Sequence, residues 1–170
     1  MTHAARIVPE ESAAEDAAAP RYDLIELLFF AYRDFVSDPD RRLADYGFGR
    51  AHHRVLHFVD RRPGLTIAEL LEILAITKQS LNRVLKELVD KEFIAQRPGA
   101  ADRRQRLLYT TPAGHELAVE LAHLQSQRIA RALAGDSGSM QDAAARFLFA
   151  MIDPGGRDLV APSREREAAR

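Results

Sequence analysis

The chain alternates between segments whose hydrophobic residues recur at helical spacing and short polar breaks that contain Pro, Gly or Asp. Residues 22–36 are apolar around most of a helical circumference, which predicts a helix that is buried, often against a second subunit. The following stretch SDPDRRLADYG is predicted to end this helix. Residues 49–61 are predicted to form a second helix, because they carry spaced apolar residues and stop at RRPG.

The segment LTIAELLEILAIT carries the start signals of two further short helices. Thr66 is an N-cap candidate with Glu69 three residues later, the spacing of a capping box. Leu65 and Leu70 flank this start at the spacing of a hydrophobic staple. Thr77 is predicted to cap the next helix. Two short helices joined by a tight turn form a helix-turn-helix.

The pattern changes after Lys91. The extended-type stretches FIAQRPG and QRLLYTT flank AADRR, which predicts a β-hairpin with a basic tip. Thr111-Pro112 then opens a helix to about Leu133, since a cap residue followed by proline is typical of a helix start. A last helix is predicted from about Met140 to Ile152. The order of elements indicates a winged helix-turn-helix, mainly α with a small β-wing.

The flanking helices at both ends have more apolar surface than one small wing domain can bury, so we expect them to form a dimer. The predicted division is a disordered lead, N-terminal dimerisation and support helices, a DNA-binding winged helix, C-terminal dimerisation helices and a flexible tail: residues 1–20, 21–61, 62–112, 113–153 and 154–170.

Composition narrows the class of protein further. The chain has 170 residues and no cysteine, which excludes a disulfide framework, a cysteine zinc site and a thiol switch. The first twenty residues lack the apolar core of a signal peptide, and no run approaches the ~18 apolar residues that a membrane span needs. We therefore expect a cytoplasmic protein without membrane contact.

Charge is unevenly distributed although the formal net charge is only −1. Residues 1–48 contain five basic and ten acidic residues, whereas residues 78–106 contain eight basic and four acidic ones. A localised positive region of this kind is the electrostatic pattern expected for a nucleic-acid contact.

The helix that follows Thr77 has two faces. One is an apolar stripe at helical spacing, predicted to be buried: Leu81, Val84, Leu85, Leu88 and Val89. The opposite face presents the predicted DNA-binding set: Thr77, Lys78, Gln79, Ser80, Asn82, Arg83 and Lys86. Amide side chains can pair with adenine and arginine with guanine in the major groove. Any amphipathic helix has a polar face, so this interpretation depends on the neighbouring helix and hairpin.

The hairpin tip is the second predicted contact with DNA. It carries Asp102, Arg103, Arg104 and Arg106. Arginines at a wing can enter a narrow minor groove, where the negative potential is enhanced. Asp102 is interpreted as a partner that holds an arginine in place. A solvated run of charges is the alternative for this segment.

Together these features resemble the winged helix of the MarR family of transcriptional regulators. The resemblance rests on the helix-turn-helix, the run VDKEFIAQRPGAADRRQRLLYTTPAGHEL, the Asp-x-Arg pattern at Asp102 and Arg104, and Thr111-x-x-Gly114. It implies a homodimer that binds a palindromic operator in double-stranded DNA, with one recognition helix per half-site. We expect a repressor that is released by a small effector, often an aromatic acid or a phenol.

The resemblance also implies an effector pocket between the dimer region and the wing domain. The candidate pocket residues are Phe30, Arg33, Arg50, His52 and His53. His53 and His57 have the i, i+4 spacing of two metal ligands, but two nitrogens make only half of a zinc site. No P-loop, dinucleotide motif, metal-hydrolase motif or nucleophile elbow occurs, so no catalytic residue, cofactor or metal is predicted. A protein-interaction module and a zinc-responsive regulator remain the alternatives.

Overall fold

In the computed structural model, residues 19–100, 102–136 and 138–160 are described. The predicted lead of residues 1–20 and the end of the predicted tail therefore lie almost wholly outside the described residues. The described chain divides into two compact units, residues up to Asp34 and residues from Phe35 onward. The helix α2, Tyr22–Ala44, spans this division.

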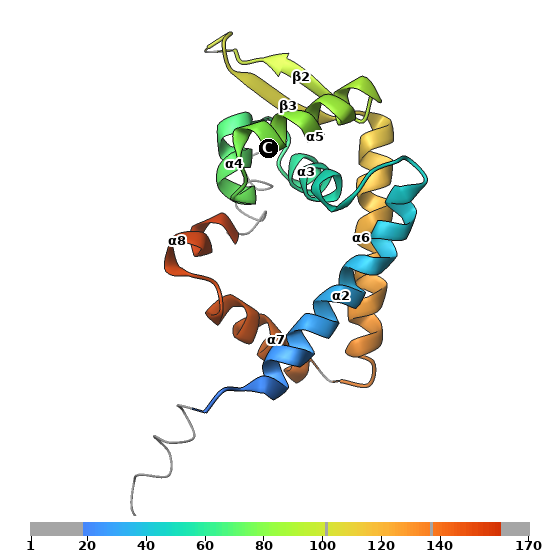
Figure 1. The fold of residues 1–170 in the computed structure, drawn as a ribbon, viewed down its shortest axis with the longest axis vertical. Helices are drawn as coiled ribbons and strands as arrows, with labels where there is room; N and C mark the ends of the chain where they lie inside the picture. The colour runs from blue at the N-terminus through green and yellow to red at the C-terminus, as the bar shows by residue number, and fades with distance from the viewer. Residues whose placement is uncertain (1–18, 101, 137, 161–170) are drawn as a thin grey trace, which may run out of the picture. The chain divides into compact units, whose positions relative to one another are not determined.

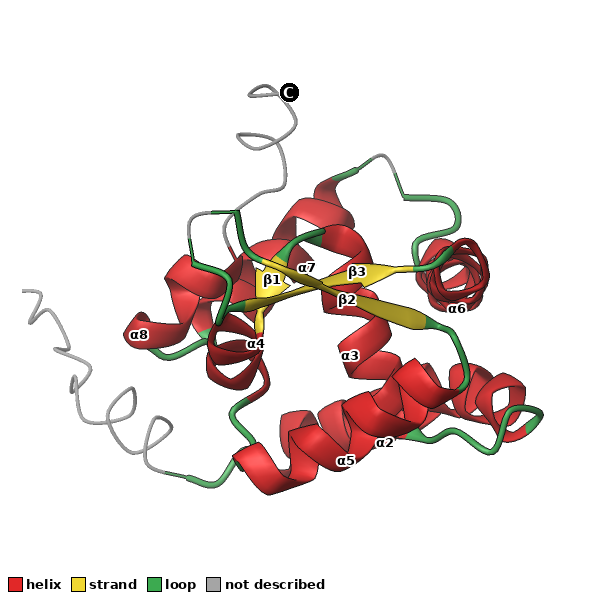
Figure 2. Ribbon diagram, turned by 90° about the horizontal axis from the view of Figure 1, so that it is seen from above, coloured by secondary structure: helices red, strands yellow, loops and turns green. Residues whose placement is uncertain are grey.

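The second unit contains the helices and strands of a winged helix-turn-helix (Figures 1 and 2). The helices before the hairpin are α3 (Arg50–Arg61), α4 (Ile67–Leu74) and α5 (Lys78–Asp90). The hairpin is β2 (Ile94–Pro98) and β3 (Arg106–Thr110), and it is followed by α6 (Pro112–Ala132), α7 (Ser139–Ala150), α8 (Pro154–Arg157) and the 3₁₀ turn η1 (Asp158–Val160). The predicted fold class is confirmed.

A third strand, β1 (Leu65–Thr66), was not predicted. It pairs antiparallel with β3, so the strand order is β1-β3-β2, and Leu65 lies opposite Leu108. Thr66 belongs to this strand and also caps α4, where its Oγ1 accepts from the Glu69 backbone N–H at 3.2 Å and its own N–H donates to Glu69 Oε2 at 2.8 Å. The predicted capping box is confirmed.

The core of this unit is built around α3, which contacts α4, α5, α6 and β3. Nine hydrophobic side chains have no exposed surface: Leu43, Val55, Leu56, Val59, Leu70, Leu81, Leu88, Leu108 and Leu121. Three of them lie on α3, so α3 belongs to the winged-helix core. The division into compact units follows Asp34, within α2.

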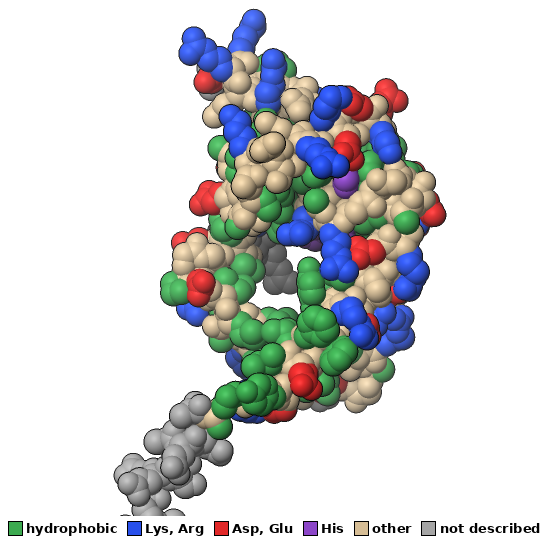
Figure 3. Space-filling view, in the orientation of Figure 1, with side chains coloured by type: hydrophobic (Ala, Val, Ile, Leu, Met, Phe, Trp, Pro, Cys, Tyr) green, Lys and Arg blue, Asp and Glu red, His purple; other side chains and the backbone are tan. Residues whose placement is uncertain are grey.

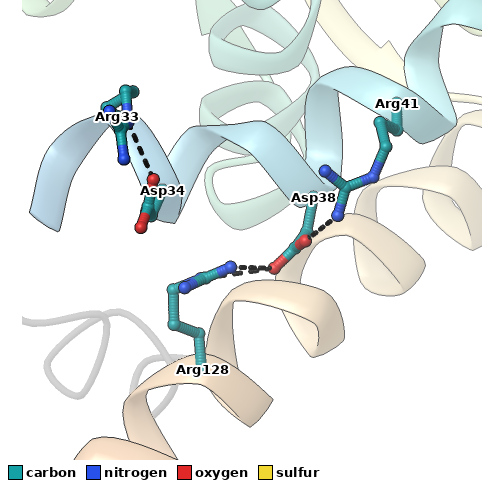
Figure 4. A network of polar contacts seen from close by, with 5 residues as sticks. All are labelled: Arg33, Asp34, Asp38, Arg41 and Arg128. Atoms are coloured by element: carbon teal, nitrogen blue, oxygen red, sulfur yellow. Dashed lines mark hydrogen bonds and ion pairs between the residues drawn. The ribbon is translucent and has the colours of Figure 1, made fainter. Parts of the chain in front are cut away.

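The first helix was predicted to stop at residue 36, but α2 continues through Pro39 and ends at Ala44, inside the stretch SDPDRRLADYG. Proline inside a helix costs about 3 kcal/mol. Here Pro39 is fully buried. Asp38 accepts from Arg128 Nη2 on α6 at 2.8 Å (Figure 4), and Arg42 Nε donates to Glu120 Oε1 at 2.7 Å. The hydrogen bond from Arg128 lowers the pKa of the Asp38 carboxyl. Burial and these ion pairs offset the cost of the proline.

Residues 154–160, the first part of the predicted tail, form α8 and η1. The guanidinium of Arg157 donates to the carbonyl of Ile152 at 3.0 Å, and Arg62, the residue after α3, donates to the carbonyl of Leu159. Sequence signals for such a segment are weak, because these contacts come from residues distant in sequence as well as local ones.

Hydrophobic side chains of α2 in the first unit are exposed in the single chain (Figure 3). Leu27 is 65% exposed and Phe29 63%. In the second unit, α7 likewise exposes Phe147 and Leu148. Among the described residues, no helix is both long and apolar enough to cross a membrane.

Candidate nucleic-acid interface

The helix α5 is anchored by its apolar face. Leu81, Val84, Leu85 and Leu88 are buried as predicted, and Val89 is partly buried. Thr77 caps the helix, since its Oγ1 accepts from the Ser80 backbone N–H at 3.2 Å. Burial of one face leaves the opposite face free to meet a partner. Every member of the predicted recognition set is exposed: Thr77, Lys78, Gln79, Ser80, Asn82, Arg83 and Lys86.

Two cations on this face have partners on α5 itself. Lys86 donates a hydrogen bond to the Asp90 carboxylate, and this bond raises the pKa of Lys86. Arg83 Nε lies 3.5 Å from Glu87 Oε1. Glu87 also accepts a hydrogen bond from His52 Nε2 of α3 at 2.9 Å, and this bond is the main reason why the pKa of Glu87 is lowered. Arg83 is thus joined through Glu87 to a neighbouring helix.

A cluster of aromatic rings lies beside the C-terminal end of α5. The ring of Phe48 stacks on His52 with centroids 4.6 Å apart and meets Phe93 edge-on at 5.2 Å. Lys91, just after α5, donates to the carbonyl of Tyr46 at 2.6 Å and lies 4.8 Å above the Phe48 ring. These contacts connect the loop between α2 and α3 to the end of α5 and the start of β2.

The wing tip depends on a close turn rather than on packing. Asp102 Oδ1 accepts from the backbone N–H of Arg104 at 2.9 Å, and Gly99 N–H donates to the carbonyl of Gln105 at 3.0 Å. A Cβ on Gly99 would lie 2.8 Å from the carbonyl oxygen of Asp102, so the turn requires glycine. Asp102 was interpreted as a partner that holds an arginine in place, and its hydrogen bond is to the backbone N–H of Arg104.

The three wing arginines, Arg103, Arg104 and Arg106, are all exposed. Lys and Arg side chains gather over the hairpin and the adjoining α5 in Figure 3, whereas acidic side chains are sparse at the hairpin tip. Arg97 on β2 lies 4.8 Å above the Tyr109 ring of β3, which places another cation on the sheet. The positive charge that was counted along residues 78–106 is therefore spread over both the helix and the wing.

The junction between the wing and α6 explains the Thr111-x-x-Gly114 pattern. Thr111 Oγ1 donates to the carbonyl of Glu92 at 2.6 Å and accepts from Gly114 N–H at 3.1 Å. A Cβ on Gly114 would lie 1.9 Å from the carbonyl oxygen of Phe93. Only glycine permits this approach, which fixes the start of α6 against the wing.

The predicted effector-pocket residues have different surroundings. In the first unit, the Arg33 guanidinium lies 4.8 Å above the Phe30 ring. In the second unit, Arg50 pairs with Asp40 at 2.7 Å. His52 forms a hydrogen bond with Glu87 and stacks on the ring of Phe48. His53 is 9% exposed, and burial lowers its pKa.

The second unit contains a cavity of ≈ 680 Å³ between α3, α4 and the C-terminal turns, and none of the five predicted pocket residues lines it. Its wall combines apolar side chains with cations and carboxylates: His57, Phe58, Arg61, Arg62, Glu72, Ile73, Ala75, Ile152, Asp153, Gly156, Leu159 and Val160.

No group of three or more His, Asp or Glu side chains within the described ranges is placed to hold a metal ion. His53 and His57 therefore have no third ligand among these residues. Sequence reasoning missed Glu87 as part of the interface. Its i, i+4 spacing from Arg83 was a visible signal, but its bond to His52, 35 positions away, was not.

Comparison with known proteins gives the family. A sequence model described as the MarR family matches residues 46–105. The HTH-type transcriptional regulator PetP of Rhodobacter capsulatus is 44% identical over 133 residues, which cover 78% of this chain and 80% of that protein.

Solved structures show the same fold. A MarR family regulator from Listeria monocytogenes complexed with a 26mer DNA has a TM-score of 0.64 at 18% identity, covering 73% of this chain and 83% of that one. BpsR of Bordetella bronchiseptica, whose DNA binding is regulated by 6-hydroxynicotinic acid, has a TM-score of 0.60 at 23% identity, covering 77% and 99%. The match to PetP over most of both chains, together with the family model, shows that the chain belongs to the MarR family, whose members are transcriptional regulators and not enzymes.

Proposed function

We propose that the protein is a homodimeric repressor that binds a palindromic operator, with α5 in the major groove and the wing in the minor groove. The observation that carries this proposal is the pairing of a buried and an exposed face on α5, next to a wing with three exposed arginines. A recognition helix uses its N-terminal residues to contact base edges. The DNA complex of the Listeria monocytogenes relative supports the same use of the fold.

The exposed residues divide by chemistry. Gln79, Asn82 and Arg83 are proposed to read bases, since amides and guanidinium form paired hydrogen bonds with base edges. The other polar residues of the helix are proposed to position it on phosphates, which gives salt-dependent affinity without sequence information: Lys78, Ser80 and Lys86, with the cap Thr77. Three arginines are proposed to contact DNA from the wing: Arg103, Arg104 and Arg106. Asp102 is proposed to hold the turn at the wing tip.

Operator selection from a randomised duplex library, followed by gel shifts at several salt concentrations, tests this proposal. Arg83→Ala is expected to cost roughly 1–3 kcal/mol on the selected duplex and to relax specificity. Arg104→Ala is expected to lower affinity on all duplexes and to flatten the salt slope, because one phosphate-region cation is lost. An equal loss on every sequence for Arg83→Ala, or an unchanged slope for Arg104→Ala, contradicts the respective assignment.

A dimer is supported by the exposed apolar side chains of each unit taken by itself. Leu27 and Phe29 lie on α2 in the first unit, and Phe147 and Leu148 lie on α7 in the second. Contiguous exposed apolar surface on a protein in water usually marks an interface. Light scattering across a dilution series is expected to give the dimer mass at micromolar concentration.

An effector that releases the repressor is proposed to occupy the cavity between α3, α4 and the C-terminal turns. Its apolar wall fits an aromatic ring, and Arg61 and Arg62 fit an acidic group. The regulation of BpsR by 6-hydroxynicotinic acid makes that compound a suitable probe. Val160→Trp is expected to fill the cavity and remove the response to the probe while operator binding persists; a wild-type response that survives Val160→Trp places the site elsewhere.

A further inference from the structure

Arg83 is the cation among the residues proposed to read bases, which are Gln79, Asn82 and Arg83. Its side chain is 84% exposed, and Nε lies 3.5 Å from Oε1 of Glu87, one turn along the same helix. A pair of this kind on an exposed helix surface contributes only a few tenths of a kcal/mol. If Glu87 were a free surface side chain, it would restrain Arg83 very little.

Glu87 is held from the other side. Its second carboxylate oxygen, Oε2, accepts from His52 Nε2 at 2.9 Å. The His52 side chain is 11% exposed and stacks on Phe48. His52 Nδ1 accepts from the backbone N–H of Gly49 at 3.1 Å. Because Nδ1 accepts, the ring proton lies on Nε2, where it can donate to Glu87.

This chain of contacts runs from the start of α3 to the exposed face of α5. Each link before Arg83 is fixed by backbone or by ring packing, so Glu87 presents its remaining oxygen in a defined direction. Lys86 and Asp90 form a similar i, i+4 pair three positions further along the helix, but Asp90 is 57% exposed. For Asp90, the part of the chain that the structure describes records no second side-chain partner.

We propose that Glu87, held by His52, is a positioning residue that directs the Arg83 guanidinium and thereby sets the base selectivity of the recognition helix. This inference rests on the proposed function, in which Arg83 reads a base. A long arginine side chain loses conformational entropy when it binds, and a partner that restrains it beforehand lowers that loss. The restraint favours the duplex whose base edge matches the preset direction.

Electrostatics gives this proposal a distinct signature. Glu87 places a negative charge on the face that meets phosphates, so Glu87→Gln removes a repulsion and is expected to tighten binding to any duplex. The same change weakens the hold on Arg83. We therefore expect Glu87→Gln to bind nonspecific DNA more tightly while it discriminates less between sequences, two effects that simple loss of folding does not produce together.

The experiment measures discrimination as the ratio of Kd for a scrambled duplex to Kd for the duplex selected by the wild-type protein, at one salt concentration. Asp90→Asn is the matched control, because it removes one negative charge from the same helix without touching Arg83. Glu87→Gln is expected to lower the ratio about two- to tenfold. Asp90→Asn is expected to shift both Kd values by a similar factor and to leave the ratio unchanged.

A double-mutant cycle shows whether Glu87 acts through Arg83. In the Arg83→Ala background, Glu87→Gln is expected to leave the ratio unchanged. A fall of the ratio in that background overturns the proposal, and so does an unchanged ratio for Glu87→Gln in the wild-type background. If Arg83→Ala itself leaves the ratio unchanged, the base-reading role of Arg83 fails and the positioning role fails with it.

Variants of His52 test whether its hydrogen bond to Glu87 is needed for base selectivity. His52→Phe keeps a ring against Phe48 but cannot donate to Glu87, so the ratio is expected to fall as it does for Glu87→Gln. His52→Gln retains an N–H donor and is expected to recover part of the ratio. Both are measured well below their thermal midpoints, because the site is buried. Equal ratios for His52→Phe and the wild-type protein overturn the role of His52.

Discussion

Hydrophobic side chains are buried in the winged-helix core but exposed on the terminal helices. Leu56, at the centre of α3, has no exposed surface, whereas Leu27, on α2 in the first unit, is 65% exposed. Both residues lie on helices with an apolar face. The core completes its burial within one chain, and the terminal helices do not. The core therefore supplies the stability of the subunit, and the exposed apolar side chains of the terminal helices belong to the proposed dimer surface.

Among the variants that test this comparison, Gly114→Ala is expected to have the largest effect on stability. A Cβ at this position would lie 1.9 Å from the Phe93 carbonyl oxygen, which neither backbone can easily avoid. We expect the free energy of unfolding to fall by more than about 4 kcal/mol, or folding to fail. Urea denaturation followed by circular dichroism measures the change. Gly155→Ala is the control, since nothing lies within 4 Å of its added Cβ, and a cost equal to that of Gly114→Ala would refute the steric argument.

A matched pair of leucines gives the next largest effect. Leu56→Ala is expected to lower the free energy of unfolding by about 2–5 kcal/mol at every protein concentration, because it leaves a cavity in the core. Leu27→Ala is expected to cost less than about 0.5 kcal/mol in a dilute monomer. At concentrations where the proposed dimer forms, Leu27→Ala is expected to lower the free energy of unfolding by more than it does in the monomer. Denaturation at several protein concentrations separates the two, and a Leu27→Ala effect independent of concentration would count against burial in a dimer.

The smallest effect concerns pH. Burial, followed by the charge of nearby His57, lowers the pKa of His53 in the folded protein below its ordinary value, against a favourable contribution from Asp40. The unfolded chain, where the imidazole has a pKa of about 6.5, then binds the proton more readily. Stability due to His53 is present above that value and is lost as pH falls toward the folded pKa. His53→Gln is expected to flatten the fall in unfolding free energy between pH 7 and 5; an unchanged slope would exclude this contribution.

Local signals predicted most of the fold because they depend on nearby residues. The capping box at Thr66 and Glu69, the cap at Thr77 and the proline after Thr111 each act within one turn of helix. The course of α2 through Pro39 was not predictable in this way. Its continuation depends on burial and on ion pairs with Arg128 and Glu120, which lie far away in the sequence.

The exposed face of α5 followed from helical angle alone, and the structure confirms that its predicted members are exposed and that its leucines are buried. The sequence could not show that Arg83 is tied through Glu87 to His52, because that contact joins two helices 35 residues apart. Nor could it show that Asp102 holds the Arg104 backbone, because turn geometry at the wing decides which group the carboxylate reaches.

By itself the sequence determined the helix-turn-helix, the hairpin, the family resemblance and the polar face of α5. The helix-turn-helix, the hairpin and the polar face follow from periodicity, capping and charge along short stretches of chain, whereas the resemblance rests on motifs such as Thr111-x-x-Gly114. Only the tertiary structure decided that α3 lies in the winged-helix core, that Gly114 must meet the Phe93 carbonyl, and that His52 anchors Glu87. Contacts between distant segments depend on packing geometry, which no local pattern of residues encodes.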